Sequence, residues 1–197
     1  MRLFVAVNVP EAERQRLFDM TSPLRSGRYP FRWVMPESMH VTLCFLGQVI
    51  ESDVARIRDT LAVVAGRHAR LSMAVGGVGA FPQLRRPRVI WVGVDGGDAL
   101  LALQADVERS LEPLGFEREQ RAWSPHLTLG RAEPHTRQTS FAGLAALADS
   151  VTYEATVDVE SVDLMRSHVG RGGARYERIA GPRLRGAMTP SKQEAGT

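Results

Sequence analysis

Two short segments of the chain repeat the same pattern of residues. His40-Val41-Thr42-Leu43 recurs as His126-Leu127-Thr128-Leu129. Side chains alternate between the two faces of a β-strand, so each histidine would share a face with its threonine while the aliphatic residues point the other way. The unperturbed pKa of imidazole lies near neutrality, so two facing histidines would supply a general base and a general acid. The threonine hydroxyls would donate hydrogen bonds to phosphate oxygens. The repeat therefore predicts a catalytic site built from two halves.

Arg131, five residues after His126, is the candidate for a positive group that neutralises charge on a phosphate in the transition state. Strict alternation along the strand places Arg131 on the face opposite His126. Its role in the site therefore requires a twist or a bulge near the end of the strand, or a long side chain that curls over the edge.

Two other kinds of site use the same residues. Cys44 lies on the same alternating face as His40, but four residues along a strand span about 13 Å, too far for a cysteine-histidine pair. A zinc site formed by His40, His126 and Cys44 would lack the short-spaced ligand pair that anchors such sites. We therefore expect neither a metal nor a cofactor.

The remaining histidines and two aromatic residues receive plainer interpretations. We expect His68, His135 and His168 to be solvated. Trp33 and Phe45 could stack on a nucleobase, as aromatic residues of RNA-binding proteins do, but we expect both to pack in the core.

The elements around the motifs also repeat. The two motifs are 86 residues apart, and the apolar runs 3–9 and 89–95 are separated by the same number of residues. This repeated spacing indicates a diverged internal duplication. The predicted fold class is α+β and bilobal, with two pseudo-twofold-related antiparallel sheets, each flanked by helices, and the active-site cleft between them. Apolar periodicity predicts strands over 2–9, 31–34, 39–46, 71–78, 88–94, 124–131, 151–159, 161–169 and 175–180. It predicts helices over 11–24, 52–67 and 98–111, and a short helix or a turn over 140–148.

Composition limits the class of protein. With 197 residues, 44% hydrophobic and 24% charged, the chain has the make-up of a globular protein, and we expect one domain over 1–181 followed by a disordered tail over 182–197. Its apolar runs are shorter than the roughly 18 residues that a membrane helix needs. We find no signal peptide and a single cysteine, which favour the cytoplasm, and we expect a monomer. All but one of the 25 basic residues are arginines, a weak indication of an anionic partner.

The paired motifs and their flanks resemble the two-histidine (2H) phosphoesterase superfamily, and within it the RNA 2',3'-cyclic phosphodiesterases first described as 2'-5' RNA ligases. The resemblance covers roughly residues 1–181. It rests on both motifs together with Arg32-Trp33-Val34, Phe45-Leu46-Gly47, Leu114-Gly115-Phe116, Ser124-Pro125 and Gly172-Gly173-Ala174-Arg175-Tyr176.

The resemblance implies metal-free opening of a ribose 2',3'-cyclic phosphate to a 2'-phosphate. By motif position, His40 would be the proton donor to the ribose 3'-oxygen and His126 the proton acceptor that activates water. Thr42, Thr128 and Arg131 would bind the phosphate of an RNA end or of a small cyclic nucleotide. The alternatives are an ATP-independent ligase that joins RNA ends through a 2'-5' bond, which is the reverse chemistry, and a non-catalytic RNA-binding module. Binding alone needs no acid-base pair.

Overall fold

The computed structural model describes residues 1–170 and 173–189. Its strands are β1 (Arg2–Asn8), β2 (Phe31–Trp33), β3 (His40–Gln48), β4 (Ala69–Phe81), β5 (Val89–Asp95), β6 (His126–Ala132), β7 (Glu154–Val159), β8 (Asp163–Gly170), β9 (Gly173–Ala180) and β10 (Arg185–Thr189). Its α-helices are α1 (Glu11–Met20), α2 (Ser22–Ser26), α3 (Val54–Arg67), α4 (Gly97–Leu111) and α5 (Leu144–Asp149), and its 3-10 helices are η1 (Pro36–Ser38), η2 (Glu51–Asp53), η3 (Glu112–Leu114) and η4 (Gln138–Phe141).

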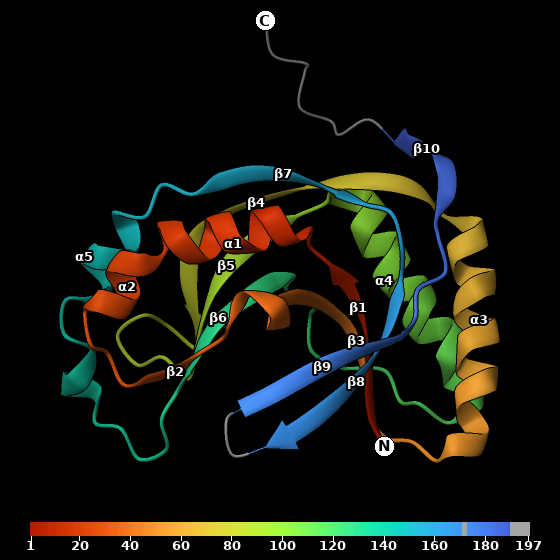
Figure 1. Cartoon of the computed structure of the whole chain (residues 1–197), viewed down its shortest axis with the longest axis horizontal. Coiled ribbons are helices and arrows are strands. Elements are labelled where there is room, and N and C mark those ends of the chain that lie inside the picture. Colours follow the sequence, from red (N-terminus) through yellow and green to blue (C-terminus); the bar gives the residue numbers. More distant parts are fainter. Residues whose placement is uncertain (171–172, 190–197) are drawn as a thin grey trace, which may run out of the picture.

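The strands form one curled sheet of ten strands in the order β10-β4-β5-β6-β3-β1-β8-β9, with β2 added to β6 and β7 added to β4 (Figure 1). Every pairing is antiparallel except that of β10 with β4. The α+β class is therefore confirmed. The prediction of two separate sheets is not confirmed. The pairing of Val41 in β3 with Leu127 in β6 joins the two halves into a single sheet.

The two motif strands lie at the centre of this sheet, each beside the strand that begins its repeat. β3 pairs with β1 and β6 pairs with β5. Helices α3 and α4 lie together on one side of the molecule, and α1, α2 and α5 lie together on another (Figure 1). Most of the buried apolar residues of both halves belong to a single cluster, so one continuous core supports both motifs. Within the described part of the chain, no helix is both long and apolar enough to cross a membrane.

The predicted helix over 11–24 is interrupted at Thr21. The Thr21 hydroxyl donates to the carbonyl oxygen of Leu17 at 2.8 Å, and α2 then begins with Pro23 in its first turn. A side chain that hydrogen-bonds to the preceding turn commonly bends or ends a helix, which explains the break.

The predicted disordered tail begins too early. The backbone nitrogen of Leu184 donates to the carbonyl oxygen of Glu160 at 2.8 Å, and that of Arg185 donates to His68 O at 2.8 Å. Leu184 is buried, and β10 pairs with β4. A single buried leucine and an open strand edge thus order residues 182–189, which the scarcity of apolar residues did not indicate. The rest of the predicted tail, 190–197, lies outside the described residues.

Candidate active site

Each motif histidine hydrogen-bonds to the backbone of the segment just before its strand. His40 Nδ1 lies 2.9 Å from the carbonyl oxygen of Ser38, and His126 Nδ1 lies 2.7 Å from the carbonyl oxygen of Ser124. A carbonyl oxygen only accepts a hydrogen bond, so Nδ1 carries the proton in both rings. Nε2 is then the atom of each ring that can accept or donate a proton elsewhere.

The two motifs face each other across neighbouring strands. The antiparallel pairing of Val41 with Leu127 sets His40 beside Thr128 and Thr42 beside His126, with the two histidines on a diagonal. Val41 and Leu127 are buried and point into the core, so the four polar side chains share the other face. The structure therefore brings the four predicted residues together, on adjacent strands rather than on separate walls of a cleft.

The two threonine hydroxyls are available for a ligand. Thr42 and Thr128 are both half-buried, and neither hydroxyl makes a hydrogen bond to another residue within 1–170 or 173–189. The backbone is nevertheless held, because Trp123 Nε1 donates to the carbonyl oxygen of Thr42 at 3.1 Å. Two positioned donors thus lie beside the two imidazoles.

A β-bulge follows the threonine of each motif. Opposite β1, Cys44 pairs with Val5 and Thr42 pairs with Ala6, which leaves Leu43 as the extra residue. Opposite β5, Gly130 pairs with Ile90 and Thr128 pairs with Trp91, which leaves Leu129 as the extra residue. A bulge interrupts alternation and re-aims the side chains that follow it.

The bulge at Leu129 brings Arg131 onto the histidine face. Arg131 pairs with Val89, two residues from Trp91, and Trp91 in turn pairs with Thr128. Because paired residues and residues two apart share a face, Arg131 and Thr128 lie on the same side of the sheet. The conflict between alternation and the role expected for Arg131 is thereby resolved.

The bulge at Leu43 places Phe45 and Cys44 on the opposite faces of the sheet from those predicted by alternation. Phe45, predicted to pack in the core, is 68% exposed and contacts Phe4 on the histidine face, with 6.4 Å between ring centroids. Cys44, predicted on the histidine face, is buried in the core instead, and burial raises the pKa of its thiol to about 12. Trp33 does pack against the core, as predicted.

Aromatic rings enclose both imidazoles. The centroid of the His40 ring lies 4.8 Å from that of Phe4 and 4.9 Å from that of Tyr176. The centroid of the His126 ring lies 5.0 Å from that of Phe81, which meets it edge-on. These rings were not among the predicted site residues, because an aromatic residue in a strand is ordinarily assigned to the core.

Burial among these groups makes both histidines weaker bases. Burial lowers the pKa of His40 to about 4; the hydrogen bond to Ser38 opposes this shift, and the charges of Arg131, His126 and Arg14 add to it. The pKa of His126 is also lowered, first by burial and then by Arg131, against the hydrogen bond to Ser124. Arg131 is thus electrostatically coupled to both imidazoles.

A buried carboxylate supports the His40 side of the site. Asn8 is the strand neighbour of His40 and donates through Nδ2 to Asp163 Oδ2 at 2.5 Å. Asp163 is fully buried and also accepts a hydrogen bond from Ser161 Oγ at 2.9 Å. Neither Asn8 nor Asp163 could be predicted as part of the site, because nothing local in the sequence links residues so far apart.

The other histidines do not join the site. His68 Nε2 lies 3.0 Å from the buried carboxylate of Asp106, and His168 Nε2 lies 2.9 Å from Glu177 Oε2, so these two are paired rather than simply solvated. Among residues 1–170 and 173–189, no group of three or more His, Cys, Asp or Glu side chains is arranged to hold a metal ion.

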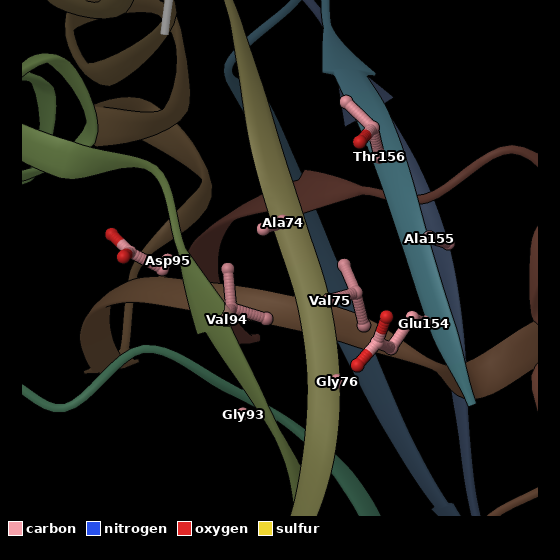
Figure 2. A pocket seen from close by; sticks show the side chains of 9 residues that line it. All are labelled: Ala74, Val75, Gly76, Gly93, Val94, Asp95, Glu154, Ala155 and Thr156. Atoms are coloured by element: carbon pink, nitrogen blue, oxygen red, sulfur yellow. The ribbon is translucent and has the colours of Figure 1, made fainter. Parts of the chain in front are cut away.

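A pocket extends from the His126 side of the site across β5, β4 and β7 (Figure 2). Gly93, which pairs with His126, forms part of its lining. Asp95 and Glu154 also line the pocket, and their carboxylates are visible in Figure 2. The sheet face is therefore acidic on one side of the motifs, whereas Arg131 makes it basic on the other.

Comparison with known proteins identifies the family. A family model described as the 2'-5' RNA ligase superfamily matches residues 15–171. The chain belongs to this superfamily. The resemblance seen in the paired motifs is thereby confirmed.

Two curated relatives of this superfamily member have the same name. An RNA 2',3'-cyclic phosphodiesterase of Archaeoglobus fulgidus is 41% identical over 133 residues, covering 68% of this chain and 73% of the relative. Another of the same name, from Methanothermobacter thermautotrophicus, is 30% identical over 176 residues and covers 89% of this chain and 95% of the relative.

Solved structures show the same fold. TT0787 of Thermus thermophilus superposes with a TM-score of 0.78 at 26% identity, over 94% of this chain and 99% of that one. LigT of E. coli, crystallised with 3'-AMP, superposes with a TM-score of 0.68 at 24% identity, over 93% of this chain and 97% of that one.

Proposed function

We propose that the protein hydrolyses the 2',3'-cyclic phosphate at an RNA 3' end to a 2'-phosphate, without a metal ion. The observation that carries the proposal is the pair of imidazoles on neighbouring strands, each with Nδ1 bound to a carbonyl and Nε2 left for proton transfer. The activity named for the relatives from Archaeoglobus and Methanothermobacter supports the choice of substrate.

In the proposed reaction, His126 Nε2 takes a proton from water as the water oxygen attacks phosphorus. The bond between phosphorus and the ribose 3'-oxygen breaks, and His40 Nε2 gives a proton to that oxygen. The products are a 2'-phosphate monoester and a free 3'-hydroxyl. The proton taken from water and the proton delivered to the ribose balance, so the enzyme needs only to exchange protons with solvent between turnovers.

The phosphate would lie between the two motifs. Thr42 and Thr128 would donate hydrogen bonds to its non-bridging oxygens, and Arg131 would neutralise the negative charge that builds on them. The structure supports this assignment through the shared face of the three residues and through the effect of Arg131 on both histidines.

The lowered pKa of His40 makes it neutral near pH 7 in the free protein. As the proton donor, His40 must gain a proton when substrate binds. An anionic phosphate beside the ring favours this, since its charge opposes that of Arg131. His126, the proton acceptor, is already neutral and ready to accept a proton.

The test uses an oligonucleotide with a 2',3'-cyclic phosphate end, incubated in excess EDTA, with the product isomer identified. His40→Gln and His126→Gln should each reduce turnover by about a hundredfold or more. His168→Gln is the matched control, because this exposed histidine is paired with Glu177 rather than with a motif residue. Near wild-type turnover in either motif variant, with an unchanged circular dichroism spectrum, would refute the two-histidine mechanism. Activity lost in EDTA and restored by zinc or manganese would refute the metal-free reaction.

A further inference from the structure

A second arginine lies directly beside Arg131. In the pairing of β2 with β6, Arg32 is opposite Arg131, and the two strands run side by side in Figure 1. Trp33, the next residue of β2, pairs with Gly130 and packs against the core. Arg32 therefore points to the same side as Arg131, which is the side of the motif histidines.

Like charges directly opposite each other in a sheet destabilise it unless something compensates them. Within the described residues, seven other arginines form ion pairs with Asp or Glu: Arg16, Arg67, Arg70, Arg109, Arg118, Arg178 and Arg183. Neither Arg32 nor Arg131 forms one with any residue of 1–170 or 173–189, and both are exposed. The pair is thus a concentration of positive charge with its guanidinium groups open to a ligand.

The two arginines are not equivalent with respect to the histidines. Arg131 is among the charges that lower the pKa of both His40 and His126, and Arg32 is not among them. Arg32 is one strand further out, and neighbouring strands lie about 4.8 Å apart. Arg32 is therefore placed beyond the phosphate that reacts.

We propose that Arg32 forms a second phosphate subsite, which binds the 5'-phosphoryl group of the terminal nucleotide while its 2',3'-cyclic phosphate lies against Arg131. The proposal rests on the function proposed above. A cyclic phosphate ends an RNA chain, so the nearest other phosphate is the one on the 5'-oxygen of the same nucleotide. Arginine suits this group because its planar fork bonds two phosphate oxygens at once.

The other charges on the histidine face of the sheet also favour binding of the 5'-phosphoryl group on the Arg32 side. The pocket on the other side of His126 carries Asp95 and Glu154, which would repel a second phosphate. The side of Arg131 and Arg32 would instead attract one. The RNA would therefore leave the site across β6 and β2.

The experiment compares three substrates with the same base: a nucleoside 2',3'-cyclic phosphate, its 5'-phosphorylated form, and a dinucleotide ending in the cyclic phosphate. We expect wild-type kcat/KM to be about tenfold or more higher for the two substrates that carry a 5'-phosphoryl group, the range for a hydrogen bond to a charged group. Arg32→Ala should abolish this preference and Arg32→Lys should restore part of it. Arg58→Ala, which removes an exposed arginine on α3, should leave the preference intact.

A dinucleotide with a neutral methylphosphonate linkage provides a test that does not depend on the variants folding. Wild type should treat this substrate like the nucleoside cyclic phosphate. Two results would overturn the subsite. One is a higher kcat/KM for the dinucleotide but not for the 5'-phosphorylated nucleotide, and the other is a preference for 5'-phosphorylated substrates that persists in Arg32→Ala. Failure of the wild type to hydrolyse any of the substrates would instead overturn the proposed function.

Discussion

Leu43 and Leu129 occupy equivalent places in the two halves of the sheet, each as the extra residue of a β-bulge directly after the motif threonine. After one bulge Phe45 turns toward the histidine face, and after the other Arg131 does so. The same kind of bulge therefore places different side chains on the histidine face: an exposed aromatic ring that contacts Phe4 in one half, and in the other half a cation whose charge acts on both histidines.

Substitution of Arg131 should impair catalysis even when the charge is kept. Lysine lacks the planar fork, so Arg131→Lys as well as Arg131→Ala should lower kcat/KM by about tenfold or more. Arg131→Ala should also raise the pKa of His126, because the charge of Arg131 lowers it. Steady-state kinetics and NMR titration of the imidazole measure the two effects. Wild-type kinetics in both variants would make Arg131 a surface residue.

The kcat/KM of the enzyme should have a bell-shaped pH profile with its maximum below pH 6.5. This parameter reports the free protein, in which the pKa of His40 is about 4 and that of His126 is also lowered from 6.5. The active form needs a proton on one ring and none on the other, so the maximum falls between the two values whichever ring is the donor. A maximum above pH 7 would contradict the lowered pKa values.

His40 should make the folded state less stable in acid. Its pKa is lower in the folded protein than in the unfolded chain, so between about pH 6.5 and pH 4 the unfolded chain binds more protons. The contribution of neutral His40 to the free energy of unfolding is complete above pH 6.5. It falls by up to about 3 kcal/mol as the pH drops toward 4. His40→Gln should flatten the dependence of the unfolding free energy on pH in this window, measured by urea denaturation. Parallel curves for the two proteins would exclude the shift.

Cys44 should be dispensable for catalysis and slow to react. Its thiol is buried and its pKa is raised to about 12, so little thiolate forms near neutral pH. Iodoacetamide should modify the folded protein far more slowly than the urea-unfolded chain, and Cys44→Ala should keep most of the activity. Rapid inactivation by the reagent, prevented in Cys44→Ala, would restore the cysteine as a candidate for the site.

Alternation in the sequence predicts which side chains share a face only for the residues that precede the bulge in each motif strand. Within His40 to Thr42 and His126 to Thr128, alternation alone places imidazole and hydroxyl on one face. Beyond Leu43 and Leu129 alternation fails, because a bulge arises from pairing with β1 and β5 rather than from local composition. The same limit applies to Asp163, which meets Asn8 only once β8 has paired with β1.

Each motif histidine is oriented by a backbone carbonyl two residues earlier, in the segment just before its strand. Many acid-base sites instead orient their histidine with a carboxylate contributed from elsewhere in the fold, so that loss of the distant group misdirects the ring. In this chain each motif histidine instead hydrogen-bonds to a nearby backbone carbonyl. The hydrogen bond that orients each imidazole therefore does not depend on the identity of a side chain, because any residue in place of Ser38 or Ser124 supplies the same carbonyl.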